Sequence, residues 1–275
     1  MNAGFLPMPA RIVAIEPLDR DHRLFSLRPA QPFDLRPGQF VEITIPGVGA
    51  FPVSACAPVA AGLLTSCIRR AGRVTEALFQ LESGALLGVR GPFGNGFPVE
   101  TFYGSDPLLI AGGLGIAPLR ALLHALLAIP ERVGRITLLY GTREPGALLF
   151  REELAGLAAT GRIDLRLSVD FAEELSLEEW GVACEVGLVN DLLRAVTFDP
   201  ARTVAALCGP PGLYRCLIEE LARAGIPPQR IFATLERRMR CGIGECCHCV
   251  TGGVFLCREG PVFSLDRLRS MEGAI

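Results

Sequence analysis

The first hundred residues alternate short apolar or β-branched runs with turn residues. Five such runs predict strands, at 10–16, 24–28, 39–45, 63–69 and 85–89. The dipeptides at Pro37, Pro46 and Gly91 punctuate them with proline and glycine. One segment, 74–81, has a helical pattern. Many short strands with a single helix predict a small antiparallel barrel.

From residue 107 the pattern changes to an apolar strand, a loop and a helix, repeated. Predicted strands lie at 108–111, 136–140, 163–169 and 204–208, and predicted helices at 117–128, 150–158 and 213–224. This alternation predicts a parallel sheet with helices on both faces. The apolar stretch 107–129 contains a glycine turn, Pro118, Arg120 and His124, so we interpret it as strand, turn and helix instead of a membrane span.

The chain therefore divides into three predicted parts: a β-barrel at 1–102, an α/β domain at 103–235, and a small appendage at 236–275. The 275 residues are enough for two domains plus an appendage. The last forty residues hold too little hydrophobic core to fold unaided.

Charge and cysteine content narrow the class of protein. The net charge of −2 gives no reason to expect nucleic acid or an anionic membrane as a partner. Met1–Gly4 lacks the basic n-region of a signal peptide, so we expect the ten cysteines to reside in a reducing cytoplasm. Five of them are expected to be ordinary buried thiols: Cys56, Cys67, Cys184, Cys208 and Cys216.

The most specific signal is a cysteine cluster near the C-terminus. Cys241, Cys246 and Cys249 form C-x4-C-x2-C, and Cys257 follows eight residues later. This is the spacing of plant-type [2Fe–2S] ligation, a centre that accepts or donates one electron. Glycines at positions 242 and 244 allow the backbone to curl around such a cluster.

A structural zinc site is the alternative, because C-x2-C is also a zinc half-motif. Zinc sites usually pair two such knuckles, whereas this chain has one triplet and one outlying cysteine. Using Cys247 as a ligand would give C-x5-C-x1-C, whose last two residues are poorly spaced to share one metal. We therefore interpret Cys247 as a free thiol.

A glycine turn follows the predicted strand 108–111 and opens a helix. It contains Gly112, Gly113, Gly115, Ala117 and Pro118. Such a turn lets the backbone approach a diphosphate at the helix N-terminus, and Pro118 suits the first helical turn. Glycine-rich turns also arise for packing reasons alone, so the motif by itself is weak.

Two further turns carry possible binding groups. Cys208, Gly209 and Pro210 follow another buried strand, where they could face the first glycine turn and place a thiol near a nicotinamide ring; the alternative is a plain turn. In the barrel, Thr75 could cap the helix that begins near Gly72, with exposed amides forming an anion site.

Three arginines lie near that barrel helix: Arg69, Arg70 and Arg73. Taken singly they are typical of a solvated edge. Beside a helix N-terminus they could be ligands of a diphosphate.

Together these motifs resemble the ferredoxin–NADP reductase superfamily, which joins a flavin-binding barrel to a pyridine-nucleotide domain. The resemblance is closer to its iron–sulfur electron-transfer subunits, especially those of anaerobic sulfite reductase and sulfhydrogenase, and more distantly that of dihydroorotate dehydrogenase. It covers nearly the whole chain, on the stretch 88–98 (GVRGPFGNGFP), the glycine turn, Tyr140–Arg143, the Cys208 turn and the closing 257–263 (CREGPVF).

The resemblance implies FAD in the barrel, NAD(P)H in the second domain and the cluster in the appendage. The implied contacts with FAD and nucleotide are Pro52, Val53, Ser54, Cys67, Ile68, Arg69, Gly72, Val74, Thr75, Gly112, Gly113, Gly115, Ala117, Pro118, Gly141, Arg143, Cys208, Gly209 and Pro210. The superfamily's usual flavin motif, Arg-x-Tyr/Phe-Ser/Thr, is here 51–54 (FPVS), so the arginine is absent. Ser54 is expected near the flavin N5, and Arg69 is a candidate replacement charge.

The predicted function is an electron-transfer subunit that moves electrons between NAD(P)H, FAD and the cluster, and on to a partner catalytic or iron–sulfur subunit. No side chain is expected to be a catalytic acid or base, because positioning is enough for hydride transfer. The alternatives are the dihydroorotate dehydrogenase subunit, which the missing arginine and the short interval to Cys257 oppose, a redox-sensing module, or a structural subunit holding zinc.

The cluster is expected at the surface, where a partner docks. Apolar residues at Ile243, Val254, Phe255 and Val262 would surround it. Phe255 and Val262 could instead pack the small domain against the nucleotide domain.

Overall fold

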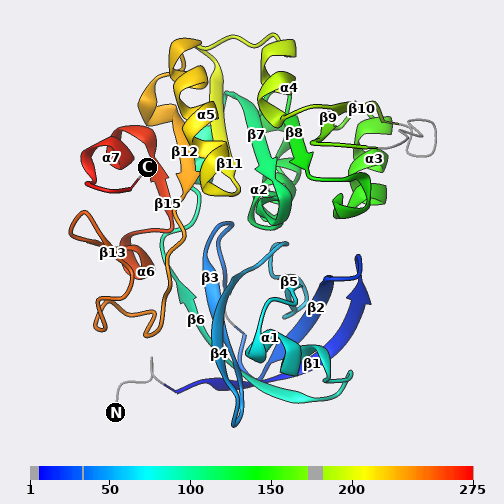
Figure 1. Ribbon diagram of the computed structural model, residues 1–275, viewed down its shortest axis with the longest axis vertical. Coiled ribbons are helices and arrows are strands. Elements are labelled where there is room, and N and C mark those ends of the chain that lie inside the picture. The colour runs from blue at the N-terminus through cyan, green and yellow to red at the C-terminus, as the bar shows by residue number, and fades with distance from the viewer. Residues whose placement is uncertain (1–5, 33, 173–181, 275) are drawn as a thin grey trace.

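The structure is a computed structural model that describes residues 6–32, 34–172 and 182–274. The segment Met1–Gly4, on which the prediction of no signal peptide rests, lies outside these residues. Figure 1 shows a strand-rich unit at the bottom, a unit with helices around a central sheet above it, and the C-terminal segment along their common side.

The N-terminal unit is a six-stranded antiparallel sheet. Its strands are β1 (Met8–Pro17), β2 (His22–Pro29), β3 (Phe40–Ile45), β4 (Gly49–Ser54), β5 (Leu64–Arg69) and β6 (Leu86–Phe93), in the order β4-β3-β6-β1-β2-β5. The end strands β4 and β5 contact each other, which curls the sheet into a barrel. Its helix α1 (Arg73–Phe79) lies over this barrel, so the predicted architecture is confirmed.

Strand β4 was not predicted from the sequence. It contains Gly49 and Pro52, which disfavour strands, but it lies at the end of the strand order, where a missing N–H breaks no ladder. Alternate side chains of the barrel strands, among them Ile12, Phe25 and Leu27, point inward into one apolar core.

The second unit is a seven-stranded sheet. It contains β7 (Asp106–Gly112), β8 (Thr137–Thr142), β9 (Asp164–Val169), β10 (Cys184–Val186), β11 (Thr203–Cys208), β12 (Ile231–Thr234) and β15 (Val262–Ser264), in the order β10-β9-β8-β7-β11-β12-β15. All neighbours are parallel except β12 and β15. The short strands β10, β12 and β15 were not predicted from the sequence.

Helices cover both faces of this sheet, as predicted. They are α2 (Ile116–Leu127), α3 (Arg151–Ala159), α4 (Val189–Ala195) and α5 (Pro211–Arg223), with 3₁₀ turns η2 (Val99–Phe102), η3 (Gly113–Gly115), η4 (Pro130–Arg132), η5 (Pro145–Ala147) and η7 (Pro228–Arg230). Helices α2 and α3 pack with Leu109 and Leu138, whereas α4 and α5 pack with Leu108 and Leu139. The alternation along β7 and β8 explains why these strands are apolar throughout.

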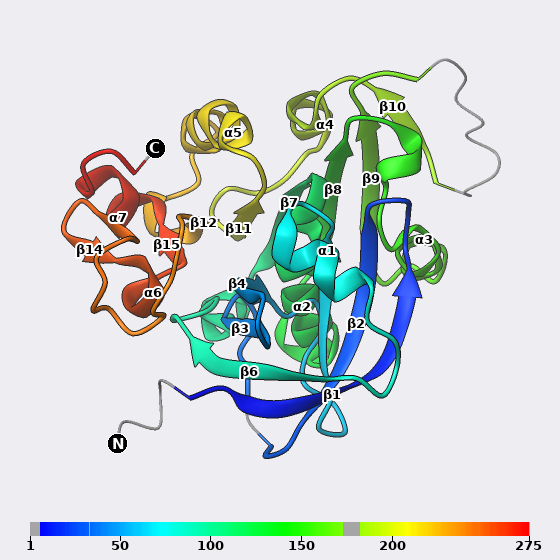
Figure 2. The ribbon, with the colours of Figure 1, turned by 60° about the horizontal axis from the view of Figure 1, so that its bottom comes forward.

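The C-terminal segment is built into the second unit. It contains a hairpin of β13 (Val250–Thr251) and β14 (Val254–Phe255), then α6 (Leu256–Glu259), β15 and α7 (Leu265–Ser270). Strand β15 pairs antiparallel with β12, and the side chains of Leu256 and Leu268 share one core with α5. Figure 2 shows this segment beside α5 and β12, on the side away from α3. The sheet thus continues across the boundary predicted at 236.

Among the described residues, no helix is long and apolar enough to cross a membrane.

Candidate functional site

A cavity of about 200 Å³ lies where the three parts of the chain meet. The barrel contributes Gly38, Phe40, Pro52, Val53, Ser54 and Cys67. The second unit, which is predicted to bind a nucleotide and is called the nucleotide unit below, contributes Leu114, Ala117, Pro118 and Thr234. The C-terminal segment contributes Glu236, Arg237, Met239 and Pro261. The structure therefore brings six of the predicted cofactor contacts, from two domains, to a single cavity.

Strand alternation decides which barrel side chains reach the cavity. Cys67 lines it, while the next residue, Ile68, is directed into the barrel core. Burial and the neighbouring Cys56 raise the pKa of the Cys67 thiol well above its ordinary value. Cys67 is therefore a neutral thiol at physiological pH, and Ile68 can offer a ligand only its backbone.

The predicted anion site of the barrel lies at the start of α1. Gly72 is the N-cap of this helix, so the prediction that Thr75 caps it is wrong. The Thr75 hydroxyl instead accepts a hydrogen bond of 2.8 Å from the amide of Ala71 and donates one of 2.9 Å to the carbonyl of Gly72. Gly72 has φ of 137°, a conformation that favours glycine. Val74 is half-buried and packs against the barrel core.

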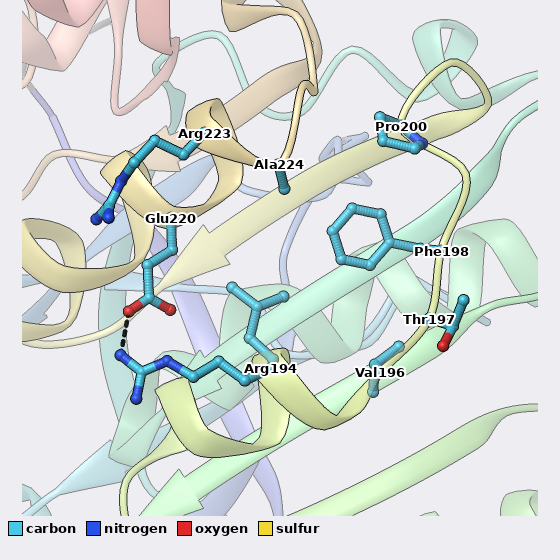
Figure 3. A pocket seen from close by; sticks show the side chains of 9 residues that line it. Arg194, Val196, Thr197, Phe198, Pro200, Glu220, Arg223 and Ala224 are labelled. Atoms are coloured by element: carbon cyan, nitrogen blue, oxygen red, sulfur yellow. Dashed lines mark hydrogen bonds and ion pairs between the residues drawn. The ribbon is translucent and has the colours of Figure 1, made fainter.

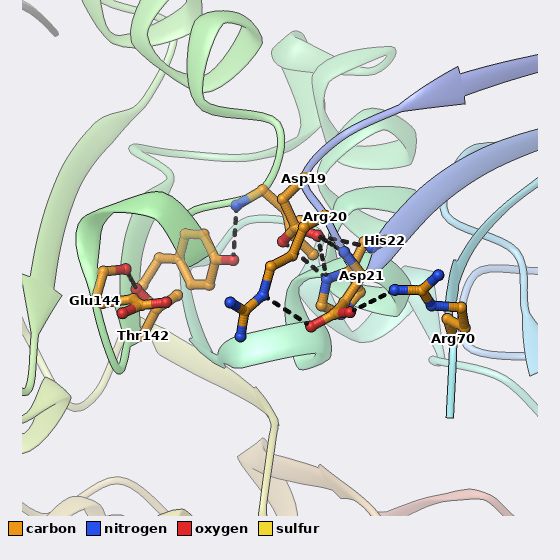
Figure 4. Close-up of polar contacts among 9 residues, drawn as sticks. Asp19, Arg20, Asp21, His22, Arg70, Thr142 and Glu144 are labelled. Carbon is orange, nitrogen blue, oxygen red and sulfur yellow. Dashed lines mark hydrogen bonds and ion pairs between the residues drawn. The ribbon is translucent and has the colours of Figure 1, made fainter. Parts of the chain in front are cut away.

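The arginines near α1 differ in their contacts. Arg73 donates to the carbonyl of Val48 at 2.9 Å, and Arg70 approaches Asp21 at 3.5 Å. Figure 4 shows Arg70 and Arg20 on either side of Asp21, in the turn between β1 and β2. Arg69 is exposed at the end of β5, which leaves its guanidinium available to an anion.

The two glycine turns of the nucleotide unit touch each other. A Cβ at Gly112 would stand 2.6 Å from Leu213, and one at Gly209 would stand 3.1 Å from Gly112. A Cβ at Gly115 would collide with the backbone of Cys208. Packing therefore requires glycine at these positions, which is the alternative weighed for the motif. Gly113 differs, because it has φ of 52° and open space around it.

The turn after β11 carries a hydrogen-bonded network. The Thr234 hydroxyl donates to the Cys208 thiol at 3.1 Å, and the Tyr214 hydroxyl lies 2.9 Å from that of Thr234. The amide of Gly209 donates to Tyr214 at 3.1 Å. Burial raises the pKa of Cys208 to about 12, and the charge of Glu236 adds to the effect. The thiol is thus held protonated beside the cavity.

Glu236 also lines the cavity, although it was not predicted from the sequence to be a site residue. It is exposed to the open cavity but surrounded by protein, and the resulting desolvation raises the pKa of its carboxyl group. No sequence signal pointed to it, because β12, which ends two residues earlier at the carboxyl edge where ligands of parallel sheets bind, is too short to be predicted.

The end of β8 holds the other predicted nucleotide contacts. A Cβ at Gly141 would stand 2.9 Å from Val189, so this glycine permits close packing on α4. Arg143 is exposed at the same edge, and its carbonyl accepts from the amide of Phe171 at 3.2 Å. Figure 4 places Thr142 and Glu144 of this edge near the β1–β2 turn that contains Asp19.

The barrel and the nucleotide unit are joined beside the cavity by Arg120 of α2. Its guanidinium donates to the carbonyl of Cys56 at 2.7 Å and pairs with Glu153 at 2.7 Å. His124 contacts the other oxygen of Glu153, also at 2.7 Å. Burial alone would raise the pKa of Glu153, but hydrogen bonds from His124 and Arg120 outweigh it and lower the pKa.

The cysteine loop places the four predicted ligands as two pairs. Among the neighbouring thiols, Cys241 affects the pKa of Cys246, whereas Cys249, and to a smaller extent Cys241, affects the pKa of Cys257. Backbone amides of Glu245 and Cys246 approach the sulfur of Cys241 at 3.4 Å each. Gly242 and Gly244 have φ of 74° and 81°, as the curled loop requires.

Four thiols in two pairs, with amides directed at a sulfur, fit a two-iron cluster, in which each iron has two cysteine ligands. Among residues 6–32, 34–172 and 182–274, no three His, Cys, Asp or Glu side chains are gathered so as to hold a metal ion.

Cys247 is exposed, with φ of 59°, and its thiol lies 3.7 Å from the carbonyl of Glu245.

The two pairs differ in burial. Cys249 and Cys257 are 2% and 1% exposed, whereas Cys241 and Cys246 are half-buried. Burial, and then the neighbouring Cys249, raise the pKa of Cys257 to about 12, while the amide of His248 is the main cause that lowers the pKa of Cys246. One side of the loop thus faces the protein and the other faces solvent.

The expected apolar ring at the surface is partly wrong. Val254 and Val262 are buried, being 8% and 2% exposed. Val254 packs with residues of β12 and α7, whereas Val262 packs at the interface with the barrel. Ile243 and Phe255 are half-buried. Val250 is an exposed apolar residue of the loop, at 39%, and its place at the surface was not predicted.

A separate cavity of about 530 Å³ lies between α4 and α5. Figure 3 shows Phe198 at its centre and the pair Arg194–Glu220, 2.5 Å apart, at one side. It is lined by the segment that precedes β11 and by the C-terminal end of α5, at the opposite edge of the sheet from the glycine turns. It contains none of the predicted site residues.

Comparison with known proteins agrees with this division of the site. Residues 109–218 match the family model of the oxidoreductase NAD-binding domain, and residues 236–269 match that of the iron–sulfur cluster binding domain of dihydroorotate dehydrogenase B.

Whole-chain relatives have the same character. The chain is 39% identical to the sulfhydrogenase 2 subunit gamma of Pyrococcus furiosus over 97% of both chains. It is 31% identical to a probable electron transfer subunit of dihydroorotate dehydrogenase B from Thermoplasma acidophilum, over 86% of this chain and 82% of the relative. A solved chain of an NADH-dependent reduced ferredoxin–NADP oxidoreductase, studied for flavin-based electron bifurcation, has a TM-score of 0.74 and 25% identity, covering 99% of this chain and 91% of its own.

Proposed function

The chain belongs to the family of electron-transfer subunits that includes the sulfhydrogenase gamma subunits and those of dihydroorotate dehydrogenase B, and from that premise we propose its task. It moves electrons between NAD(P)H, FAD and a [2Fe–2S] cluster, and on to a catalytic or iron–sulfur subunit of a larger complex. We assign FAD to residues 1–102, NAD(P)H to residues 103–235 and the cluster to residues 236–275.

The observation that carries this proposal is the shared cavity. Ser54 and Cys67 of the barrel, Pro118 of the nucleotide unit and Pro261 of the C-terminal segment all line it. A group held there contacts every part of the chain at once. This is the arrangement that electron exchange between three cofactors requires, because transfer depends on close approach.

The residues present suit FAD and a pyridine nucleotide. FAD supplies the step between two-electron hydride chemistry and one-electron transfer. Ser54 offers a hydroxyl to the ring system, and Arg69 offers charge for a diphosphate in place of the arginine that the superfamily usually has. The protonated thiol of Cys208 excludes an additional negative charge from the nicotinamide side.

The cysteine pairs assign the ligands of the two irons. Cys249 and Cys257, on the buried side, would hold the iron nearer the cavity. Cys241 and Cys246, half-buried, would hold the iron nearer solvent and a partner. Amides directed at the Cys241 sulfur stabilise negative charge on that side.

We place this chemistry in the cytoplasm. All ten cysteines lie in the part of the chain that the structure describes, and none forms a disulfide. Cluster thiolates and buried free thiols both persist in a reducing compartment.

The direct test is cofactor content after anaerobic purification. We expect about one FAD and about two irons with two acid-labile sulfides per chain, and a rhombic electron paramagnetic resonance signal on reduction with NAD(P)H. Stoichiometric zinc without sulfide would instead support a structural subunit. Cofactors in place with negligible turnover to artificial acceptors would support a redox sensor.

The identity of the partner subunit is a separate test. The relatives include both sulfhydrogenase and dihydroorotate dehydrogenase subunits. The chain has a higher sequence identity to the sulfhydrogenase subunit, 39% against 31%, which favours a hydrogenase or sulfur-reducing partner. Co-purification of the native complex decides between them, because only the dihydroorotate dehydrogenase assignment predicts that the complex oxidises dihydroorotate.

A further inference from the structure

The stretch 88–98 contains a turn, Gly94–Gly96, that packs against the C-terminal segment at Gly94 and against residues 36–39 of the barrel at Gly96. Gly94 and Gly96 have φ of 78° and 73°. A Cβ at Gly94 would collide with the carbonyl of Gly260 and stand 2.7 Å from Pro261. The turn follows β6 of the barrel and therefore forms a close-fitting seat for residues 260–262.

Asn95, between the two glycines, makes three hydrogen bonds to this segment. Its amide N–H donates to the carbonyl of Gly260 at 2.7 Å. Its side-chain Nδ2 donates to the carbonyl of Val262 at 2.7 Å, and its Oδ1 accepts from the amide of Val262 at 3.2 Å. The carboxamide thus pairs with both polar groups of one residue, as a neighbouring strand would. It thereby supplies hydrogen-bond partners at the outer edge of β15, the last strand of the sheet.

The segment held by Asn95 connects the two predicted redox sites. Cys257, a buried ligand, precedes Gly260 by three residues, and Pro261 lines the shared cavity. The amide of Leu235 donates to the carbonyl of Pro261 at 2.8 Å, and Val262 is paired with Thr234 in the sheet. Residues 257–261 therefore form a short covalent link from the inner cysteine pair to the cavity.

We propose that Asn95 is a positioning residue that fixes this link, and with it the cluster, relative to the flavin in the barrel. The inference rests on the proposed function for the identity of the cofactors. Asn95 itself touches neither cofactor; it acts through Gly260 and Val262. Because the turn that contains Asn95 belongs to the barrel, Asn95 connects the flavin-binding part of the chain directly to residues 257–261, which begin at the predicted ligand Cys257.

Two variants and a control test the role. Asn95→Asp keeps the shape and the acceptor but loses the Nδ2 donor and places a carboxylate against the Val262 carbonyl. Asn95→Ala removes both side-chain bonds. Asn190→Asp, at a half-buried position of α4, which packs on β8 and β9 away from β15, is the control for an added carboxylate.

The first measurement is amide hydrogen exchange, which needs no cofactor. In Asn95→Ala the amides of Val262 and Leu235 are expected to exchange about tenfold faster, since a hydrogen-bonded clamp is lost. Exchange in β1 and β7 stays unchanged, and Asn190→Asp behaves as wild type.

The second measurement follows electrons in the loaded protein by rapid mixing with NAD(P)H. Flavin bleaching is expected at the wild-type rate in both Asn95 variants, while the cluster signal appears about tenfold more slowly, because small displacements of reacting groups are costly in rate. Flavin and iron contents are measured in every sample, so that loss of cofactor is not mistaken for slow transfer.

Unchanged cluster reduction in fully loaded Asn95→Ala would overturn the proposal, as would equal slowing of flavin and cluster reduction. Wild-type protein that binds neither flavin nor iron would overturn the proposed function instead. In that case unchanged exchange at Val262 would still refute the clamp, and faster exchange would still support it.

Discussion

The Thr234 hydroxyl donates a hydrogen bond of 3.1 Å to the Cys208 thiol and so joins the end of β12 to the end of β11. Both residues are buried, at 5% and 2%, and Thr234 lines the shared cavity. The pairing holds the thiol in one orientation at the carboxyl edge of the sheet. The Cys208 thiol, which is by nature a weak hydrogen-bond donor and acceptor, is therefore held in place as a neutral group.

This burial predicts instability in alkaline solution. Desolvation raises the pKa of Cys208 from 9.0 to about 12, so the folded protein retains a proton that the unfolded chain releases. The free energy of unfolding should fall as pH rises between these values, by about 1.4 kcal/mol per pH unit for this thiol. Thermal unfolding of wild type and Cys208→Ala from pH 7 to 10.5 measures it, with exposed Cys216→Ala as the control. Parallel stability curves for wild type and Cys208→Ala would refute the assignment.

Serine variants test the cluster ligands. Replacement of Cys241, Cys246, Cys249 or Cys257 should each abolish or severely weaken iron binding, because a hydroxyl is a poor ligand for this centre. Cys247→Ser should retain about two irons per chain. Iron and sulfide analysis decides; loss of the cluster in Cys247→Ser would show that the ligand set is wrong.

The inner and outer ligands should also differ in apoprotein stability. Cys257 is buried among Leu256, Val254 and Cys249, so a serine there places a hydroxyl in an apolar core. We expect a loss of about 1–3 kcal/mol on unfolding for Cys257→Ser and less than about 0.5 kcal/mol for half-buried Cys246→Ser. Denaturant unfolding of the metal-free proteins makes the comparison.

Arg143 tests nucleotide preference. Its exposed guanidinium at the end of β8 could pair with the 2′-phosphate of NADPH. In that case Arg143→Ala should lower kcat/KM for NADPH about tenfold or more while leaving NADH nearly unchanged. Equal changes for the two nucleotides would exclude contact with a 2′-phosphate and leave Arg143 as a loop residue.

The outer face of the cysteine loop tests partner docking. Val250, 39% exposed, lies in β13, directly after the predicted ligand Cys249. Val250→Asp should abolish co-purification of the partner subunit, since an interface core tolerates an unpaired charge poorly. Reduction of a viologen dye by NAD(P)H should persist. Leu86→Asp, on the outside of the barrel and 57% exposed, is the control; equal loss of the partner in both would argue against this face.

Glu153 tests the junction of barrel and nucleotide unit. Hydrogen bonds from His124 and Arg120 lower its pKa below 4.5, so its contribution to stability is present above that pH and disappears as pH falls through the lowered value. Glu153→Gln should cost about 1 kcal/mol at pH 7, and the difference from wild type should shrink in acid. Unfolding curves at pH 7 and near pH 3.5 check this; a constant difference would contradict it.

The sequence determined local structure and the chemistry of single motifs. Period-two runs set the barrel strands, and the buried strands of the nucleotide unit stood out because both of their faces are covered by helices. The spacing of Cys241, Cys246, Cys249 and Cys257 predicted the ligand set, since a loop with fixed spacing is itself a geometric constraint. Glycines at 112 and 209 were also visible as turns.

Tertiary structure decided what distant segments do to one another. Strands β12 and β15 are too short to give a periodic signal, and they exist because each pairs with a neighbour. The same pairing buries Val262, which in the sequence was equally compatible with a surface. Pro261 and Glu236 reach the cavity, and Asn95 reaches Val262, only because the chain returns there after more than a hundred residues. Burial and hydrogen bonding depend on such long-range contacts, and no local pattern of residues encodes them.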